Sequence, residues 1–391
     1  MERVERQGLR AFWGEIVEAA GRNVGASSKS IVVTHMLGDR PYFLEALDRV
    51  VPIACVMAKP KSIDQSAFRQ VARRSKTTVA NRSVLATRSG IEGVVSSHGL
   101  SQKSVIAIDI GGYFAPCLAH LAELVRLMGV VEDTENGQRK YEQVMGDEFP
   151  CPVFSAARSP LKNAEDYLVG HSVVFSAEAL MRSRGDVLQG RTACVIGYGK
   201  VGRSIAQLLR SHGVLITVHD SNPIPLTEAH AHGFAVRRNL SEALSGAGII
   251  MCATGNLALR SENFEAVQAG AYVVSVTSSD DEMELGPLKD RYERNRISAD
   301  IVRYRRLSER RSEAHFFFVL NNGEAVNFLH GAVVGPAIQL VQAELVMAAG
   351  RLAGGDIEDA RFAINGLSRE DREMIATVWL KHFAGKVNNE H

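Results

Sequence analysis

The segment SPLKNAEDYLVGH, residues 159–171, contains three side chains that can carry or exchange a proton: Lys162, Asp166 and His171. Lys162 and Asp166 are four residues apart, a spacing that places them on the same face of a helix. Such a lysine and carboxylate can form a solvated ion pair on the surface, which is the commoner case. They can also be two proton-transfer groups that point into a site. The segment alone leaves both interpretations open.

The composition is that of an ordinary globular protein. The chain has 391 residues, of which 46% are apolar and 23% are charged, and this length predicts two domains. The 45 basic and 44 acidic residues give a net charge of +1, which does not support a nucleic-acid or membrane partner. No apolar run could span a bilayer and the N-terminal residues lack a signal core, so we expect a cytoplasmic protein.

The five cysteines are scattered, odd in number and never arranged as CxxC: Cys55, Cys117, Cys151, Cys194 and Cys252. This pattern predicts reduced thiols, and Cys194 and Cys252 lie in apolar segments typical of a core. No Cys or His pair has zinc-ligand spacing beside a second pair, so we expect no metal site.

Short apolar segments alternate with amphipathic ones, as is typical of parallel sheets covered by helices. The pattern predicts an α/β fold with two parallel sheets covered by helices, one before and one after a boundary near residues 185–191. The expected strands are 30–36, 52–58, 104–110 and 151–156 in the first series, and 192–199, 214–220, 248–255 and 271–278 in the second.

Residues 192–220 combine a strand, a glycine-rich turn, a helix and a second strand, which is the pattern of a dinucleotide-binding unit. Gly197 permits the tight turn, Gly199 lets a pyrophosphate approach the backbone, and Gly202 lets the helix pack on the strand. The helix begins near Lys200 and Val201, and its free N–H groups would face the phosphates. The whole pattern predicts a dinucleotide cofactor.

Asp220 ends the second strand of this unit. A carboxylate there accepts hydrogen bonds from the adenosine ribose and repels a 2′-phosphate, which favours NAD over NADP. The CATGN segment supplies Thr254 and Asn256 for the nicotinamide side. We also assign Val276, after the next strand, to cofactor binding.

The order of these features resembles the S-adenosylhomocysteine hydrolase family. The similarity runs weakly from about residue 25 to residue 350 and is strongest from Gly129 to Asp220. It implies two doubly wound, Rossmann-like parallel-sheet domains: an NAD-binding Rossmann domain, residues 188–330, inserted in a substrate domain made of residues 1–187 and 331–391. It also implies a homo-oligomer, either a dimer or a tetramer.

The resemblance assigns catalytic roles to four residues. SPLKNAEDYLVGH is similar to the family's Ser-Val-Thr-Lys-Ser-Lys-Phe-Asp-Asn-Leu-Tyr-Gly-Cys, which places Lys162 and Asp166 on the catalytic lysine and aspartate. GVVEDTENGQRK is similar to the family's Glu-Glu-Thr-Thr-Thr-Gly segment, which places Asp133 on a substrate-binding glutamate. His35, in THM, falls on an active-site histidine near the sugar 5′ carbon.

The same two comparisons extend the cofactor site. Thr134, Glu135 and Asn136 fall on three threonines that contact NAD in the family, and Asn327, in GEAVNF, falls on an asparagine that contacts the cofactor.

The activity implied by the resemblance begins with NAD-dependent oxidation of a ribose 3′-hydroxyl. The resulting ketone acidifies the C4′–H, the 5′ thiol leaves, water adds, and the ketone is reduced again. We therefore expect an adenosylhomocysteinase-like, NAD-dependent enzyme, a hydrolase and oxidoreductase, that acts on a nucleoside or nucleoside thioether. In this context the catalytic interpretation of Lys162 and Asp166 is favoured over a surface ion pair.

Several family residues are replaced. Tyr167 stands for an asparagine, His171 for a cysteine, Ile110 for a substrate-binding aspartate and Ser278 for a loop histidine. The family's Gly-His-Pro segment reads VGP here, with Val334 before Gly335 and no histidine. The replaced groups hold the 5′ substituent, move water to it and recognise the base.

Two interpretations of function therefore stay open. The chain is an enzyme that oxidises the 3′-hydroxyl, with or without chemistry at C5′, or a catalytically silent NAD-binding regulatory paralogue. His171 and His330 could replace the missing imidazoles, but each is equally well explained as a structural histidine. Retention of Lys162 and Asp166 favours the enzyme.

Overall fold

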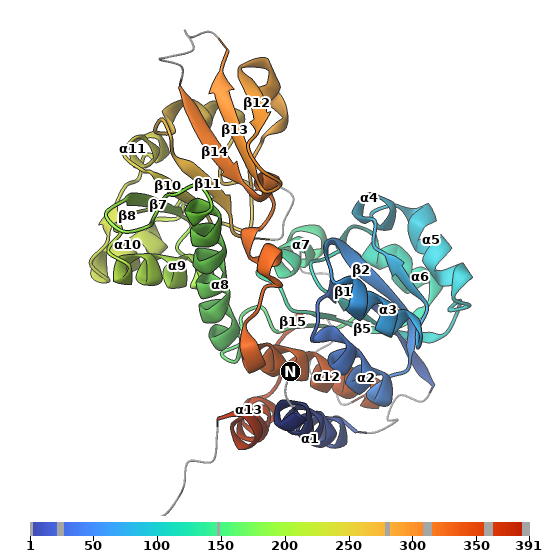
Figure 1. The fold of residues 1–391 in the computed structure, drawn as a ribbon. Helices are drawn as coiled ribbons and strands as arrows, with labels where there is room; N and C mark the ends of the chain where they lie inside the picture. Colours follow the sequence, from blue (N-terminus) through green and yellow to red (C-terminus); the bar gives the residue numbers. More distant parts are fainter. Residues whose placement is uncertain are drawn as a thin grey trace, which may run out of the picture. The chain divides into compact units, whose positions relative to one another are not determined.

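The computed structural model describes residues 3–21, 27–146, 149–277, 282–307, 315–355 and 363–384 (Figure 1). The chain forms two compact units. Unit 1 contains Met1–Lys162 and Gly335–His391, and unit 2 contains Asn163–Val334. Unit 2 is thus inserted in unit 1, with its limits at 162/163 and 334/335 where the sequence suggested 187/188 and 330/331.

Unit 1 contains a seven-stranded sheet in the order β15-β6-β5-β4-β1-β2-β3, and all of its strand pairs are parallel. The strands are β1 (Ser28–Met36), β2 (Ile53–Ile63), β3 (Thr77–Val79), β4 (Ser104–Asp109), β5 (Arg126–Glu132), β6 (Val153–Ser155) and β15 (Ile364–Asn365). Strands β1 and β4 carry apolar residues on both faces, as expected for a sheet covered on both sides.

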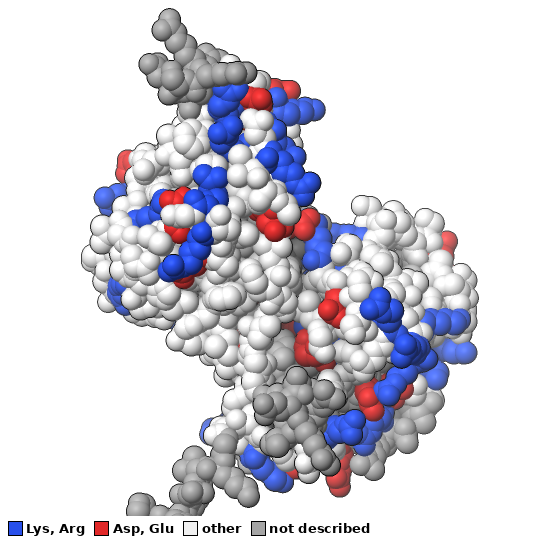
Figure 2. Space-filling view, viewed as in Figure 1, with Lys and Arg blue, Asp and Glu red and all other residues white. Residues whose placement is uncertain are grey.

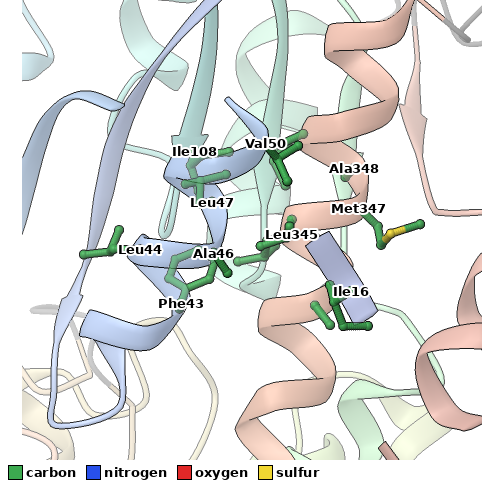
Figure 3. Packing of buried hydrophobic residues seen from close by; sticks show 14 of the residues in the cluster. Ile16, Phe43, Leu44, Ala46, Leu47, Val50, Ile108, Leu345, Met347 and Ala348 are labelled. Atoms are coloured by element: carbon green, nitrogen blue, oxygen red, sulfur yellow. The ribbon is translucent and has the colours of Figure 1, made fainter. Parts of the chain in front are cut away.

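Two hydrophobic clusters lie on the two faces of this sheet. One is built with α1 (Arg3–Ala19), α2 (Arg40–Val50), α3 (Gln65–Ala72), α12 (Ile338–Gly354) and α13 (Arg369–Phe383). The other is built with α4 (Arg82–Leu85), α5 (Arg88–Ser97), α6 (Leu118–Leu124) and α7 (Glu135–Met145). Figure 3 shows part of the first cluster, where Ala46 and Val50 of α2 lie against Leu345 and Ala348 of α12.

Unit 2 contains an eight-stranded sheet in the order β12-β13-β14-β11-β10-β7-β8-β9. Its strands are β7 (Thr192–Ile196), β8 (Leu215–His219), β9 (Ala235–Val236), β10 (Ile249–Cys252), β11 (Tyr272–Ser275), β12 (Tyr292–Arg296), β13 (Ile301–Arg306) and β14 (Phe316–Leu320). The six neighbouring strands β14, β11, β10, β7, β8 and β9 are parallel. The β12–β13 and β13–β14 pairs are antiparallel. The antiparallel edge was not expected from the sequence.

The helices of unit 2 include α8 (Lys162–Arg182), α9 (Lys200–Ser211), α10 (Pro223–Ala231) and α11 (Leu240–Ser245). Helices α8 and α9 pack closely, because the Ser204 hydroxyl donates to the Tyr167 carbonyl at 2.6 Å and a Cβ added at Gly170 would lie 2.4 Å from Ser204 Oγ. Cys194 and Cys252 are fully buried in the sheet, as predicted.

The α/β fold with an inserted domain is confirmed, and each of the eight expected strands is present. In the segment that leads back to unit 1, residues 326–330 form a 3₁₀ turn, and α12 begins at Ile338, after Pro336. Among the described residues, no helix is both long and apolar enough to cross a membrane. On the face drawn in Figure 2, basic and acidic side chains both occur on each unit.

Each sheet has a switch point beside its first strand, where later strands are added on the opposite side. In unit 1 it lies between β1 and β4, because β2 is added on one side of β1 and β4 on the other. In unit 2 it lies between β7 and β10 for the same reason. Ligands of open α/β sheets bind at the carboxyl ends of the strands at such points, so both edges are candidate sites.

Candidate functional site

The carboxylate of Glu132 joins several chain segments at the carboxyl edge of the unit 1 sheet. Glu132 is the last residue of β5 and is fully buried. It accepts hydrogen bonds from the amides of Gly111 (2.9 and 3.0 Å) and Gly112 (2.8 Å), which follow β4. It also accepts from the amides of Asp133 (2.9 Å) and Thr134 (2.8 Å), and from the Thr134 hydroxyl (2.9 Å). Five donor groups thus fix one carboxylate.

The start of α7 closes over this carboxylate. Thr134 caps the helix by accepting the Gly137 amide at 3.0 Å. A Cβ atom added at Gly137 would lie 2.0 Å from Glu132 Oε2, so only glycine fits there. Burial, together with the charges of Asp109 and Asp133, raises the pKa of Glu132 to about 8 in spite of the donors.

A second buried carboxylate, Asp109 at the end of β4, also accepts hydrogen bonds from nearby groups of unit 1. It accepts from the amides of Tyr113 (2.9 Å) and Phe114 (2.8 Å) and from the Tyr141 hydroxyl (2.5 Å). Burial raises the pKa of Asp109. Both carboxylates therefore hold the loops after β4 and β5 in place.

Lys162 and Asp133 meet at this edge. Lys162 Nζ lies 3.5 Å from Asp133 Oδ1, and the two residues are only 8% and 7% exposed. Asp166 is 9% exposed. The interpretation of Lys162 and Asp166 as a solvated surface pair is therefore wrong, because neither side chain belongs to a solvated face.

His35 belongs to the same electrostatic environment. It lies near the end of β1, and its Nδ1 is 2.5 Å from the Ser62 hydroxyl. Burial, followed by the positive charges of Lys59, Arg40 and Lys162, holds the pKa of His35 well below its usual value. We therefore expect a neutral imidazole at His35, within the electrostatic influence of Lys59, Arg40 and Lys162.

The other residues that the sequence placed near the cofactor in this segment are at the surface of α7. Glu135 forms ion pairs with Arg158 (2.8 Å) and Arg139 (3.0 Å). Asn136 lies half-buried in the first turn of the helix. Thr134, Glu135 and Asn136 all belong to unit 1.

Sequence analysis missed several polar residues of this edge: Lys59, Arg82, Glu132 and Lys140. Glu132 had a usable signal, because a carboxylate directly ends the apolar run before Asp133. Lys59 had a weaker one, since it follows the apolar run of β2. The positions of Arg82 and Lys140 had no local signal.

The glycine-rich turn of unit 2 has the geometry that each glycine was expected to serve. Gly197 has φ +93°, and a Cβ atom there would lie 2.7 Å from the Ala253 carbonyl. A Cβ atom at Gly202 would lie 2.0 Å from the Gly197 carbonyl, so strand and helix are in close contact. A Cβ atom at Gly199 would meet no atom within 4 Å. The turn is therefore open only at the glycine that a pyrophosphate would approach, and its residues fit the cofactor.

Asp220 follows β8 and connects to this turn. Its Oδ2 accepts the Tyr198 amide at 2.8 Å, and its Oδ1 accepts the Asn222 amide at 2.9 Å. The carboxylate thus lies beside the glycine-rich turn, where a ribose would follow the pyrophosphate. At the start of α9, Lys200 lies 3.7 Å from Asp166, and Val201 packs against the core.

The turn after β10 is held by a buried carboxylate that the sequence did not single out. Glu282, 1% exposed, accepts the Gly255 amide at 2.7 Å and the Thr277 hydroxyl at 2.6 Å. The Thr254 hydroxyl donates to the Asn256 carbonyl at 2.6 Å. Burial raises the pKa of Glu282 to about 7, although the hydrogen bonds act in the opposite direction.

Two further predicted cofactor residues lie at the same edge of unit 2. Val276 follows β11 and is 3% exposed. Asn327 is 5% exposed, and its Oδ1 finds no hydrogen-bond partner among the described residues. A buried amide oxygen of this kind usually has a partner, so Asn327 is a reasonable ligand contact.

His171 and His330, which could replace the family's missing histidines, both contact other side chains of unit 2. His330 Nδ1 lies 2.9 Å from the Ser176 hydroxyl of α8. The His171 ring lies 4.5 Å from the Tyr167 ring, and burial, with His212, lowers the pKa of His171. Ser278, which stands for the family's loop histidine, lies outside the described residues.

Comparison with known proteins gives the class of unit 2. Residues 166–333 match the family model of the S-adenosyl-L-homocysteine hydrolase NAD-binding domain. Unit 2 is an NAD-binding domain, with the glycine-rich turn of a Rossmann fold, and the cofactor is NAD. Such domains serve NAD-dependent oxidoreductase chemistry.

Three solved structures show partial similarity to this chain. A glyoxylate reductase from Paecilomyes thermophila is 14% identical, with 64% of this chain and 73% of that chain covered and a TM-score of 0.38. A phosphoglycerate oxidoreductase from Vibrio cholerae o395 is 16% identical, with coverage of 67% and 79% and a TM-score of 0.38. A formate dehydrogenase from Granulicella M. is 11% identical, with coverage of 63% and 74% and a TM-score of 0.38.

Proposed function

We propose that the protein is an adenosylhomocysteinase-like, NAD-dependent enzyme that oxidises the ribose 3′-hydroxyl of a nucleoside or nucleoside thioether. The observation that carries this proposal is the buried contact of Lys162 Nζ with Asp133 Oδ1 at 3.5 Å. The family match of the NAD-binding domain supports it independently.

NAD, when bound, supplies the acceptor for the hydride that leaves the sugar carbon. Gly197, Gly199 and Gly202 would hold its pyrophosphate at the start of α9, and Asp220 would hold its adenosine ribose. Thr254 would line the nicotinamide side.

Lys162 is the residue that we assign to the proton of the 3′-hydroxyl. In its neutral amine form, Nζ can accept that proton; the ammonium so formed would stabilise the alkoxide and return the proton when the ketone is reduced. Asp133 holds the lysine side chain in place. A neutral His35 adds a hydrogen-bonding group without adding positive charge.

Chemistry at C5′ has less support. The family's histidines are replaced, and His330 is bonded to Ser176 within unit 2. We therefore expect oxidation of the 3′-hydroxyl but weak or absent hydrolysis of adenosylhomocysteine. Release of homocysteine and adenosine at rates ordinary for enzymes would contradict this expectation.

The test is to add nucleosides to the purified, NAD-loaded protein and to follow the absorbance of NADH. A competent substrate should reduce part of the bound NAD, and its 3′-deoxy analogue should bind without reducing it. If nucleosides that bind give no NADH, the enzyme assignment fails and an NAD-binding regulatory protein becomes the better description.

A further inference from the structure

The pairing of β1 with β2 is interrupted at the carboxyl edge of the unit 1 sheet. Thr34 pairs with Ala58, and Met36 pairs with Ile63, so His35 alone stands opposite residues 59–62. An irregularity of this kind bends the longer strand and redirects its side chains. Lys59 is the first residue of the extra stretch.

Lys59 is buried without a close carboxylate partner among the described residues, and its Nζ lies 6.0 Å from the centre of the Tyr113 ring. The residue is 7% exposed, and within the described residues its ammonium forms neither a hydrogen bond nor an ion pair. The ammonium lies beside the loop after β4, where a Cβ atom at Gly111 would be 3.2 Å from Nζ. Burying an ammonium is unfavourable unless a partner compensates it.

Two more cations converge on the same loop. Arg82 donates to the Gly111 carbonyl at 3.2 Å, and its guanidinium lies 3.8 Å from the Tyr113 ring centroid. Lys140 donates to the same carbonyl at 3.4 Å. In the part of the chain that the structure describes, Arg82 forms no ion pair with a carboxylate. We call Lys59, Arg82 and Lys140 the basic cluster.

The carboxylates of Asp109, Glu132 and Asp133 all have closer partners than Lys59 and Arg82. Asp109 and Glu132 accept from amides and hydroxyls of their own loops, and Asp133 lies beside Lys162. Burial lowers the pKa of Lys59 to about 8; Glu132 and Asp133 raise it, and Arg82 and Lys140 lower it further. An anion placed between the three cations would remove this mutual repulsion.

We propose that the basic cluster binds an oxyanion of the substrate, a phosphate or a carboxylate group. Arg82 and Lys140 donate to the Gly111 carbonyl and the Lys59 ammonium lies near the same residue, so all three cations can donate to a ligand oxygen at this loop. The substrate is then an acidic nucleoside rather than a neutral one. This inference rests on the proposed function in one respect: it takes the bound anion to be a group of the nucleoside substrate.

The test measures binding, not turnover. Calorimetric titrations of the NAD-loaded protein use inorganic phosphate, adenosine 5′-monophosphate, adenosine 5′-carboxylate and neutral adenosine. We expect inorganic phosphate to bind and at least one charged nucleoside to bind ten-fold or more tightly than adenosine. The two charged nucleosides distinguish a phosphate site from a carboxylate site.

Variants assign the binding to the cluster. Lys59→Met, Arg82→Gln and Lys140→Met should each weaken binding of the charged ligand by about ten- to a hundred-fold, as charge-assisted hydrogen bonds do. Adenosine binding should change little. Lys103→Met is the matched control, because Lys103 is exposed and precedes β4 at the opposite edge of the sheet. Arg82 and Lys140 are only half-buried, so they test the proposal even if Lys59→Met does not fold.

Proton uptake adds a second readout. At a pH slightly above 8, anion binding should protonate Lys59, so the binding enthalpy should depend on the ionisation enthalpy of the buffer, and Lys59→Met should abolish this dependence. Equal affinity for adenosine and its charged derivatives, or unchanged binding in all three variants, would overturn the proposal. If neutral adenosine reduces NAD and no anion binds, the anion site is wrong but the proposed function stands. If anions bind and no nucleoside reduces NAD, the proposed function is wrong but the anion site stands.

Discussion

Asp166 Oδ2 lies 3.7 Å from Lys200 Nζ, at the first residue of the helix that follows the glycine-rich turn. The carboxylate that the sequence assigned to sugar oxidation is therefore also in contact with the expected pyrophosphate site. A charge change at Asp166 should be felt by Lys200 and hence by the cofactor. The aspartate is better described as a positioning group than as a second proton carrier.

Lys162→Met should slow NAD reduction by a competent nucleoside by about two or more orders of magnitude, because it removes the proton carrier and keeps much of the bulk. Asp166→Asn should slow the same step less and should also weaken NAD binding. Stopped-flow absorbance of NADH and NAD titrations measure the two effects. Lys162 is buried, so its loss should lower the free energy of unfolding by about 1–3 kcal/mol.

The exposed Lys103→Met is again the control and should leave the rate unchanged. The assignment of Lys162 fails if Lys162→Met retains the wild-type rate of reduction with the fold intact.

Asp220→Ala should reduce the preference for NAD over NADP by about ten-fold or more, because the repulsion of a 2′-phosphate disappears. NAD itself should bind more weakly, since Asp220 also accepts the Tyr198 amide of the glycine-rich turn. Gly199→Val should block both cofactors without unfolding the protein, because a Cβ at Gly199 meets open space. Paired Kd values for NAD and NADP measure these effects; an Asp220→Ala protein with unchanged preference would remove the ribose assignment.

Glu282 should give unit 2 an unusual pH dependence. Its pKa is raised from 4.5 to about 7 in the folded protein, so the folded state binds the proton more tightly than the unfolded chain. This group therefore lowers the free energy of unfolding as the pH rises from about 4.5 to about 7, by about 3 kcal/mol in total. Glu282→Gln should remove the fall in the free energy of unfolding between about pH 4.5 and 7, and above pH 7 it should be more stable relative to wild type than it is at low pH.

Thermal unfolding in a series of buffers tests the effect of Glu282. Glu262→Gln, at an exposed position of the same unit, serves as the control and should follow the wild-type profile. Parallel profiles for Glu282→Gln and wild type would show that the buried carboxyl does not titrate in this range.

Gly170→Ala should destabilise unit 2 by about 1–3 kcal/mol, because the added Cβ would lie 2.4 Å from Ser204 Oγ and 3.1 Å from the Ile205 amide. Helices α8 and α9 would have to separate, and NAD binding should weaken with them. Gly93→Ala, in α5, is the matched control: its Cβ meets nothing within 4 Å, so it should stabilise by about 0.5–1 kcal/mol. Denaturant unfolding of both variants tests whether helices α8 and α9 pack as closely at Gly170 as described.

The sequence predicted what local patterns encode. The apolar runs around Ile31 and Val195 gave the strands, and the spacing of Gly197, Gly199 and Gly202 located the cofactor turn, because each signal lies within a few residues. The antiparallel strands β12 and β13 were missed, since their five arginines hide the alternation of a strand.

The site in unit 1 was predicted only in part. Asp133, Lys162 and His35 were named from the resemblance, but the contact of Lys59 with the loop at Gly111 depends on the register change between β1 and β2. Such a change has no signature in composition or periodicity. Glu282 was missed for the same reason, because its partners Gly255 and Thr277 become neighbours only when β10 and β11 pair.

The Glu132 carboxylate has a consequence for how this protein could diverge. Its donors are backbone amides and one hydroxyl, so the shape of the edge depends on main chain near Gly111 and Thr134 and not on the side chains that face a ligand. Arg82 and Lys140 reach the same loop only through a carbonyl oxygen. If the basic cluster binds the substrate as proposed, exchanging Arg82 and Lys140 would change the ligand that the site accepts and leave the loop in place, whereas a side chain at Gly137 would collide with Glu132 and disrupt the loop.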